Sequence, residues 1–486
     1  MNTTGQTRRG FLKAVGLAAA CVAGAPLVHR AIAAEAGAAA GANPAKKPNV
    51  LFILTDDQRE DTVSALGNSN IKTPNLDSLV KRGVVFRNAF CMGGFSGAVC
   101  LPSRMQTLRG RCWFHVRNLP AGFSNFPTSM KQAGYETFFL GKADNSDGQV
   151  QGLFEHVGHV SPSPQPGKPL ADGTIEFVKT RKKDRPFFIY LGGPAPHDPR
   201  VAPKEYMDMY DPAKIPLPPN FKPFHPFNNG EMVIRDEKLA GWPRGEDEIR
   251  RHLRDYYAMI THMDAQFGRI FQALKDAGEF DNTIVVFSSD QGIAIGSHGL
   301  MGKQNLYEPS MGVPLVFAGP GIPAGKEADA FAYHFDIMPT VLDLVGAKVP
   351  GDIDGKSLAG VIHGQSEGVR DTIFLAYKDI QRAVRKGPWK LLRYPKVDKT
   401  QLFNLADDPY ETKDLAAEPS QAERVKEMLA LMAQQQRLFD DHDPLTVDNP
   451  AKAEVDLGFF HKNPAQTQSG DAKPKDKTRR KANAKD

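Results

Sequence analysis

The chain has 486 residues, of which 41% are hydrophobic and 24% are charged, so most of it should fold around a large core. Its formal net charge of +5 is concentrated at the two ends: residues 1–35 hold four basic residues against one glutamate, and the last twenty residues hold seven basic residues against three aspartates. The body between them is near neutral, which excludes a charge-based argument for nucleic-acid binding.

The N-terminus has the pattern of an export signal. Residues Thr7–Lys13 (TRRGFLK) resemble a twin-arginine motif, Ala14–Val28 form an apolar stretch, and residues 31–33 (AIA) offer a small-residue cleavage site. We expect a signal peptide over 1–33, a linker over 34–47, and export by the twin-arginine machinery to the periplasm or the exterior. A buried amphipathic helix is the alternative interpretation.

Six mostly apolar runs of strand length follow, separated by patterns of helical length. The expected strands are Asn49–Thr55, Gly83–Phe86, Glu136–Leu140, Arg185–Leu191, Thr283–Ser289 and Val313–Gly319. The expected helices include Thr73–Gly83, Asp255–Gly278 and Asp336–Gly346. This alternation predicts an α/β domain over 48–370, in which a large, mostly parallel sheet is sandwiched by helices.

The pattern changes near residue 371, where short runs are separated by turn residues. A helix from about Pro419 to Phe439 follows them, and together they predict a C-terminal α+β subdomain over 371–445. Residues 446–486 are expected to form an extended, disordered basic tail. The small antiparallel sheet of the subdomain is expected from Ile373–Tyr377, Gln381–Lys386, Trp389–Tyr394 and Thr400–Leu405.

Polar residues follow four of the expected strands. They are Asp56, Asp57, Lys142, His197, Asp290 and Gln291. An aspartate pair after a strand is more often a helix cap or a turn. Because ligands bind beyond the carboxyl ends of parallel strands, however, we expect these side chains to meet at one edge of the sheet. Three carboxylates and an amide oxygen favour Ca²⁺, with Mg²⁺ less favoured, over zinc.

The stretch SGAVCLPSRMQTLRGR, residues 96–111, places a cysteine close to an arginine. Pro102 fits the first turn of a helix, whose N-terminal N–H groups would face an anion beside Cys100. Arg104 would add a guanidinium to this anion site. A buried thiol at the start of a helix is the alternative.

The cysteine count leaves two possibilities open. Cleavage of the signal would remove Cys21 and leave Cys91, Cys100 and Cys112. In an oxidising compartment Cys91 and Cys112 could form a disulfide, with Cys100 left over. Buried free thiols are the alternative.

Two long loops are candidates for the walls of a site. Ser161–Pro169 is rich in proline and serine, and Pro212–Arg244 contains the polar candidates His225, Arg235 and Asp236. Long loops within a compact enzyme often carry function, and a plain surface excursion is the alternative.

The residues around Cys100 match a known signature. Cys100-Leu101-Pro102-Ser103-Arg104 reads Cys-x-Pro-Ser-Arg, with Leu108, Gly110 and Arg111 in its continuation and Arg109 in place of the usual threonine. The chain thereby resembles a type I sulfatase of the alkaline-phosphatase-like superfamily, over roughly residues 48–440. The resemblance implies an alkaline-phosphatase-like fold and a sulfuric ester hydrolase of the arylsulfatase type. It also implies a maturation enzyme that oxidises Cys100 to formylglycine.

The resemblance further implies roles for individual residues. Arg104 and Lys142 would hold the formylglycine diol. Lys303 and His197 would bind the sulfate oxygens, and His197 or His298 would protonate the leaving oxygen. The implied metal ligands are Asp56, Asp57, Asp290, Gln291 and the oxidised Cys100.

One departure from the family pattern concerns the lysine region. Relatives commonly carry a histidine two or three residues after the lysine that matches Lys142, whereas this chain has Asp144 and Asn145 there. Asp144 or another side chain would then assist the expulsion of sulfate.

The leading hypothesis is an exported sulfatase that acts on sulfate esters such as those of sulfated polysaccharides. Its partners would be the substrate, the formylglycine-generating enzyme and the twin-arginine machinery, with no nucleic acid. Two alternatives remain open: a phosphonate or phosphodiester hydrolase of the same superfamily, and a non-catalytic binder of sulfated glycans.

Overall fold

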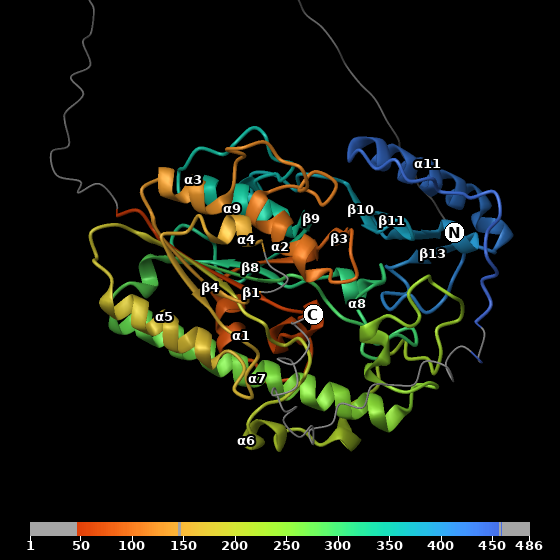
Figure 1. The fold of residues 1–486 in the computed structure, drawn as a ribbon, viewed down its shortest axis with the longest axis horizontal. Helices are drawn as coiled ribbons and strands as arrows, with labels where there is room; N and C mark the ends of the chain where they lie inside the picture. Colours follow the sequence, from red (N-terminus) through yellow and green to blue (C-terminus); the bar gives the residue numbers. More distant parts are fainter. Residues whose placement is uncertain (1–45, 144–146, 456–457, 459–486) are drawn as a thin grey trace, which may run out of the picture. The chain divides into compact units, whose positions relative to one another are not determined.

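The computed structural model describes residues 46–143, 147–455 and 458 (Figure 1). The expected signal peptide over 1–33 and most of the linker lie outside the described residues, as do Asp144 and Asn145. From Lys47 onward the described chain forms one compact unit. No helix in the described ranges combines the length and the apolar character needed to cross a membrane.

A large sheet forms the centre of the α/β domain. Its eight strands lie in the order β5-β4-β6-β1-β7-β8-β2-β9. They are β1 (Asn49–Thr55), β2 (Gly83–Phe90), β4 (Glu136–Gly141), β5 (His156–His159), β6 (Phe187–Gly192), β7 (Thr283–Ser289), β8 (Leu315–Ala318) and β9 (Lys326–Tyr333). All six predicted strands are present, which confirms the α/β class. The two additional strands, β5 and β9, form the edges and are partly exposed, so neither has the apolar run of a central strand.

The sheet is mostly parallel, as predicted. β5, β4, β6, β1 and β7 pair in parallel, and so do β2 and β9. The exception is β8, which is antiparallel to both of its neighbours. The loop from β7 to β8 contains only the four-residue helix α8 (Glu308–Met311). Without a long crossover helix the chain returns in the opposite direction.

Helices cover both faces of this sheet (Figure 1). The longer ones are α1 (Pro74–Lys81), α2 (Cys100–Arg109), α3 (Phe126–Gln132), α5 (Lys168–Thr180), α7 (Glu246–Asp276), α9 (Ile337–Leu344) and α11 (Ala422–Leu438). The shorter ones besides α8 are α4 (Gly148–Gln151), α6 (Lys204–Met207) and α10 (Ala359–Ile362). The helix predicted from Asp255 begins nine residues earlier, at Glu246. Its first turn holds three acidic residues, which favour a helix N-terminus.

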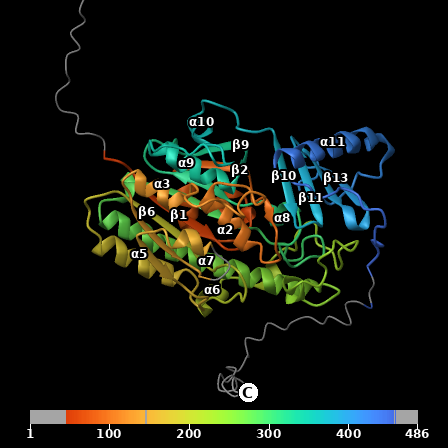
Figure 2. The ribbon, with the colours of Figure 1, turned by 45° about the horizontal axis from the view of Figure 1, so that its top comes forward.

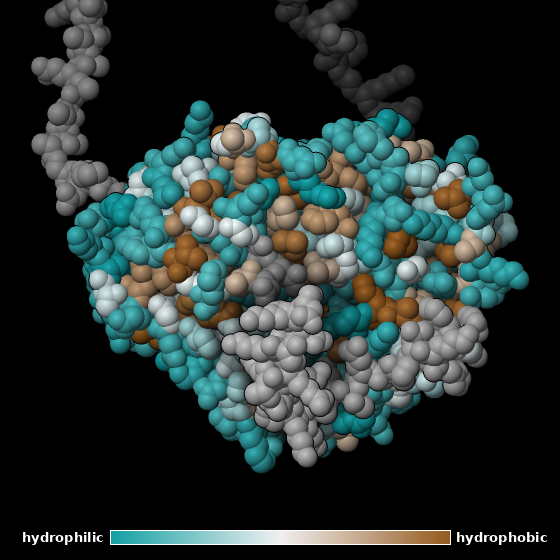
Figure 3. Space-filling view, in the orientation of Figure 1, coloured by the Kyte–Doolittle hydropathy of each residue, from teal (hydrophilic) through white to brown (hydrophobic). Residues whose placement is uncertain are grey.

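Successive residues of β1 point into two different cores, because side chains alternate along a strand. Leu51 and Ile53 pack in the core that α5 and α7 cover. Phe52 and Leu54 pack in the core that α2, α3 and α9 cover. The face in Figure 3 is mostly hydrophilic with scattered apolar patches, in keeping with the burial of these runs.

The second sheet has five strands in the order β13-β12-β11-β10-β3. Four of them confirm the predicted antiparallel series: β10 (Thr372–Tyr377), β11 (Gln381–Lys386), β12 (Trp389–Tyr394) and β13 (Lys399–Asn404). The fifth, β3 (Gly93–Gly94), comes from the α/β domain and pairs in parallel with β10. A Cβ atom on Gly93 would lie 2.2 Å from the Ala376 carbonyl oxygen, so this close pairing requires glycine. α11 packs against this sheet (Figure 2).

The start of the expected tail is held on the body. Ala451 donates its N–H to the Lys396 carbonyl at 2.8 Å, and the Ala453 carbonyl accepts from the Asn228 N–H at 2.8 Å. Residues 446–455 therefore lie along the fold without forming a helix or strand.

The described cysteines are buried free thiols, so the disulfide interpretation is wrong. Cys91 Sγ lies 3.0 Å from Gln291 Oε1, beside the carboxyl end of β7. Cys112 follows α2 and lies beside Asp354. The two sulfurs therefore have different surroundings, and neither faces the other.

We predict that Phe52→Ala lowers the free energy of unfolding by about 3–5 kcal/mol, because it leaves a cavity in the core beside the central strand β1. The Phe52 ring is fully buried and meets the Tyr190 ring edge-on at 5.2 Å. Denaturant unfolding measures the change. Leu438→Ala is the control, since Leu438 is 65% exposed and should change stability by less than about 0.5 kcal/mol. Equal effects of the two substitutions would contradict the assigned core.

Candidate active site

Four neighbouring parallel strands bring the predicted polar residues to one edge of the sheet. β4, β6, β1 and β7 are adjacent in the strand order. The residues that follow them are Lys142, His197, Asp56, Asp57, Asp290 and Gln291. Because the strands are parallel, their carboxyl ends meet, as the sequence predicted.

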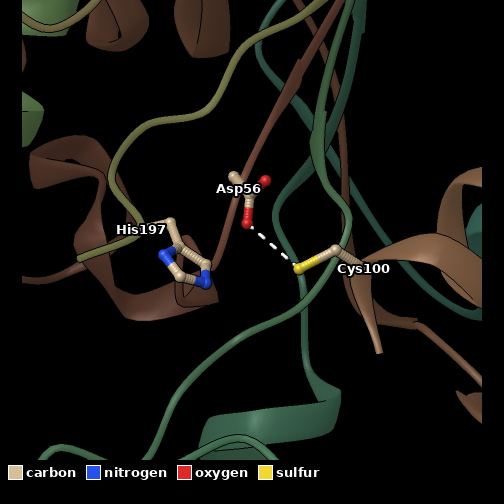
Figure 4. Close-up of side chains that lie close together, drawn as sticks. All are labelled: Asp56, Cys100 and His197. Carbon is tan, nitrogen blue, oxygen red and sulfur yellow. Dashed lines mark hydrogen bonds between the residues drawn. The ribbon is translucent and has the colours of Figure 1, made fainter. Parts of the chain in front are cut away.

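Three carboxylates and a thiol converge at this edge. Asp56, Asp57, Asp290 and Cys100 are all buried, and their ligand-type atoms lie within 4.8 Å of one another. Cys100 Sγ is 3.1 Å from Asp56 Oδ1 (Figure 4) and 3.8 Å from Asp57 Oδ1. Asp57 has a left-handed backbone, with φ at 67°, and its N–H donates to Asp290 Oδ1 at 3.1 Å. Aspartate adopts this region more readily than most residues other than glycine.

Cys100 is the first residue of α2, which confirms the helix start predicted from Pro102. The expectation that free N–H groups of this helix would bind an anion is wrong for two of them. Leu101 and Ser103 donate their N–H groups to the carbonyls of Ala98 and Val99, both at 3.1 Å. The turn that precedes the helix consumes these donors, so side chains must supply most of the positive charge.

Arg104 joins the carboxylates from two strands. Its guanidinium donates to Asp290 Oδ2 at 2.8 Å and to Asp56 Oδ2 at 2.9 Å. It also donates to the carbonyls of Gly192 and Gly193, each at 2.8 Å. The side chain is fully buried. Arg104 therefore holds the carboxylates in position and does not present a free fork to an anion.

Two lysines complete the charged cluster. Lys303 Nζ lies 2.7 Å from both carboxylate oxygens of Asp57 and 3.1 Å from Cys100 Sγ. Lys142 Nζ donates to Asp56 Oδ2. Arg104, Lys142 and Lys303 thus balance three carboxylates in a buried space.

The pKa values in the cluster reflect the competition between burial and neighbouring charge. Burial raises the pKa of Asp290 to about 6, and the negative charge of Asp56 adds to this rise. Burial opposes ionisation of Asp56 as well, but Lys142 and Arg104 outweigh it and hold its pKa well below the usual value. Burial and the nearby carboxylates raise the pKa of the Cys100 thiol, so an unmodified Cys100 is protonated.

His197 is the exposed member of the set, with 25% of its side chain accessible to solvent. Its Nε2 lies 3.8 Å from Asp57 Oδ2, and its Nδ1 lies 2.8 Å from the Asp198 carbonyl oxygen. A carbonyl can only accept, so Nδ1 carries a proton. Nε2 is the ring nitrogen that faces the cluster (Figure 4).

The three carboxylates fit a hard divalent cation, because their oxygens converge on one buried point and no other metal-ligand type dominates there. Gln291, the fourth predicted ligand, is buried beside them. Its Oε1 accepts from Cys91 Sγ at 3.0 Å, so coordination by this oxygen would replace that hydrogen bond.

The structure does not bring His298 to this cluster. Its ring stacks on Tyr307 with centroids 3.8 Å apart, and its Nε2 lies 3.0 Å from Asn220 Nδ2 and 3.6 Å from Glu411 Oε2. His298 lies at the tip of a turn in which Gly296 donates to the Leu300 carbonyl. Lys303 follows in the same segment. The two residues are therefore close in sequence, but their side chains face different groups.

Both long loops contribute to the surroundings of His197. Ser161–Pro169 and His197 line a pocket of about 200 Å³, mostly with proline and other apolar side chains. From the second loop, Arg235 Nη1 lies 2.7 Å from Asp198 Oδ1, and Asp236 Oδ2 accepts from Gln304 Nε2 at 2.7 Å. His225, in contrast, is buried, and burial lowers its pKa to about 3.

Sequence reasoning missed Asp198 and Gln304. Asp198 faces the His197 imidazole, with Oδ1 3.4 Å from Nδ1, and Gln304 anchors Asp236. The sequence offered one signal for them: Asp198 directly follows His197, and Gln304 directly follows Lys303.

Comparisons with known proteins identify the family. The sulfatase family model matches residues 48–347, and the model of the N-sulphoglucosamine sulphohydrolase C-terminal region matches residues 296–438. The chain is 25% identical to the N-acetylglucosamine-6-O-sulfatase of Bacteroides thetaiotaomicron, over 82% of this chain and 88% of that protein.

Solved structures share the fold. One, in complex with its substrate D-glucosamine-2-N,6-O-disulfate, has a TM-score of 0.69 and 23% identity, and the match covers 82% of this chain and 99% of the other. The phosphonate monoester hydrolase of Agrobacterium radiobacter has a TM-score of 0.66 and 24% identity, over 80% of this chain and 96% of that one. With the family model matched across more than half of its residues, the chain belongs to the sulfatase family and is a sulfuric ester hydrolase.

Proposed function

We propose that this protein hydrolyses sulfate esters with Cys100 as its reacting residue, after a maturation enzyme has oxidised Cys100 to formylglycine. The observation that carries the proposal is the position of Cys100 Sγ, 3.1 Å from both the Asp56 carboxylate and the Lys303 ammonium. A buried thiol beside two carboxylates is a poor nucleophile, because its pKa is raised. The same position suits an oxygen that must lose a proton and attack sulfur.

The modification and the cation would supply the chemistry that the side chains lack. A hydrated formylglycine carries two hydroxyls on one carbon, one to attack sulfur and one to expel sulfate afterwards, and Ca²⁺ lowers the pKa of a bound hydroxyl. Asp56, Asp57 and Asp290 would hold the cation, with Gln291 as a further ligand. Arg104 keeps two of these carboxylates oriented.

Charge makes the site selective for anions. Three basic side chains already balance three carboxylates, so a divalent cation would leave an excess of positive charge in a buried space. An anionic sulfate ester would neutralise it. Lys303, which lies on both Asp57 and Cys100, and Lys142 are the cations placed to contact its oxygens.

We assign the proton that the leaving alcohol needs to His197. Its Nδ1 faces Asp198. Burial opposes ionisation of the Asp198 carboxyl, but Arg235 outweighs it and lowers the pKa of that carboxyl to about 2. Asp198 holds Nδ1 and so orients the ring with Nε2 toward Asp57 and the cluster. His197 also lines the pocket beside the site, where an ester oxygen can approach.

The substrate and the location are also proposals. The relative named N-acetylglucosamine-6-O-sulfatase and the N-terminal twin-arginine motif together support a sulfated sugar that is met in the periplasm or outside the cell. Formylglycine formed in the cytoplasm is compatible with a route that exports folded proteins.

We expect Cys100→Ala to abolish hydrolysis of aryl sulfates and sulfated glucosamine while the protein stays folded. Chain produced with a formylglycine-generating enzyme should carry the aldehyde at Cys100, as read by mass spectrometry of the peptide that contains both Cys91 and Cys100. Cys91 is the internal control and should remain a thiol.

Two assays separate the alternatives for the matured protein. A phosphonate monoester measured in parallel should turn over more slowly than the sulfate ester, and the opposite preference would support the phosphonate hydrolase. Glycan binding without turnover by protein that carries the aldehyde would overturn the enzymatic proposal.

We predict that Asp57→Asn removes calcium-dependent stabilisation and activity together. Calcium at about 100 times its Kd should stabilise the wild-type fold by about 2.7 kcal/mol, since it binds only the folded chain. Melting temperature and bound calcium are measured with and without a chelator. Asp61→Asn is the matched control, because Asp61 is half exposed and forms an ion pair with Arg59. A full calcium response in Asp57→Asn would exclude the proposed metal site.

The role of His197 as proton donor predicts a dependence on the leaving group. His197→Gln should lower kcat by about 10²–10⁴-fold for a sugar sulfate, whose alcohol is a poor leaving group. An aryl sulfate with an acidic phenol should lose much less, because its oxygen leaves without a proton. His363→Gln, at an exposed histidine, should leave both rates unchanged. Equal losses on both substrates would assign His197 to binding.

A further inference from the structure

A second group of metal-ligand side chains lies at the other end of α2. This helix has ten residues and is about 15 Å long. Just beyond it, the Cys112 thiol and the His115 imidazole meet the carboxylate of Asp354, and their ligand-type atoms lie within 4.8 Å of one another. The sulfatase chemistry described above uses none of these residues.

The backbone holds the three side chains together. His115 donates its N–H to the Cys112 carbonyl at 3.0 Å, which places both side chains on one side of a single turn. Asp354 Oδ2 accepts from the Cys112 N–H at 3.0 Å. The Asp354 N–H donates in turn to the Gly110 carbonyl at 3.0 Å, so the loop after α9 is fixed against the end of α2.

The hydrogen bonds of His115 match those of a metal-binding histidine. Nδ1 faces Asp354 Oδ2 at 2.9 Å, and Nε2 faces Asp440 Oδ2 at 3.0 Å. Metal-bound histidines usually donate their second ring N–H to a carboxylate, which sets the tautomer and the ring orientation. Asp440 provides this outer partner if Nδ1 binds the ion.

The site is open on one side. Cys112 is fully buried, whereas the side chains of His115 and Asp354 are 25% and 23% exposed. An ion can therefore enter from solvent, and a water molecule can take a fourth position.

We propose that Cys112, His115 and Asp354 bind a zinc ion, with Asp440 as the outer partner of His115. A thiolate, an imidazole and a carboxylate form a ligand set that suits Zn²⁺, whereas Ca²⁺ prefers oxygen ligands alone. On binding, the Zn–S bond replaces the thiol S–H bond, and the proton passes to solvent. Tetrahedral coordination at about 2.0–2.3 Å needs ligand atoms about 3.2–3.8 Å apart, which requires the His115–Asp354 contact to open by a few tenths of an ångström.

The proposed zinc ion would have a structural role and no catalytic role. The ion would join the end of the helix that begins at Cys100 to the loop after α9, and through Asp440 to the segment after α11. This inference is independent of the proposed reaction.

The test uses the full chain in a Cys100→Ala background, since the Cys100 thiol lies close enough to Asp56 and His197 to bind zinc itself. Excess Ca²⁺ is added to compete with Zn²⁺ for the carboxylates of the active-site cluster. After addition of Zn²⁺ and gel filtration, elemental analysis should find one zinc per chain and a raised melting temperature. Co²⁺ in place of Zn²⁺ should give a thiolate-to-cobalt charge-transfer band in the near ultraviolet.

Variants of the cluster decide whether the zinc is held there. Cys112→Ser and His115→Gln should lose the zinc and the cobalt band, and Asp440→Asn should weaken zinc binding about 10–100-fold. Asp352→Asn is the matched control, because Asp352 lies two residues from Asp354 but pairs with Arg111. Should Cys112→Ser fail to fold, the partly exposed His115 provides the decisive variant. Absence of bound zinc, or full zinc binding by folded His115→Gln, would overturn the proposal.

Discussion

The active site depends on one buried guanidinium. Arg104 has no exposed surface and joins Asp56, after β1, to Asp290, after β7. Buried ion pairs are costly to desolvate, and removing one partner leaves a buried charge without compensation. Here the pair aligns two carboxylates from separate strands and attaches them to α2, one turn beyond Cys100. The positions of Cys100 and of the converging carboxylates therefore depend on the same side chain.

Charge balance follows from that arrangement. Three carboxylates this close together would repel one another, and each would resist ionisation in a buried space. Arg104, Lys142 and Lys303 offset the repulsion, and Lys303 spans Asp57 and Cys100. In the proposed reaction, a divalent cation added to this neutral cluster would give the positive excess that favours an anionic ester. His197 is the partly exposed member of the cluster, and this is the side on which the proposed proton transfer would take place.

The second sheet also helps to position the active site. β3 precedes Cys100 by a few residues and pairs with β10, so the C-terminal subdomain supports the segment that leads to Cys100. The cluster around Cys112 lies at the opposite end of α2, where it joins the loop after α9 and the segment after α11. Both ends of α2 therefore lie against segments that come much later in the sequence.

The sequence alone was enough to predict the α/β class and the six main strands, because buried parallel strands leave long apolar runs. It also predicted most of the polar residues at the carboxyl edge of the sheet, because they directly follow those runs. It also predicted the helix that starts at Cys100, from Pro102. It could not determine that Arg104 would bind carboxylates, that His298 would stack on Tyr307, or that Cys91 and Cys112 would lie apart. Those outcomes depend on which side chains meet across the fold, and contacts between residues far apart in the chain leave no periodic pattern in it.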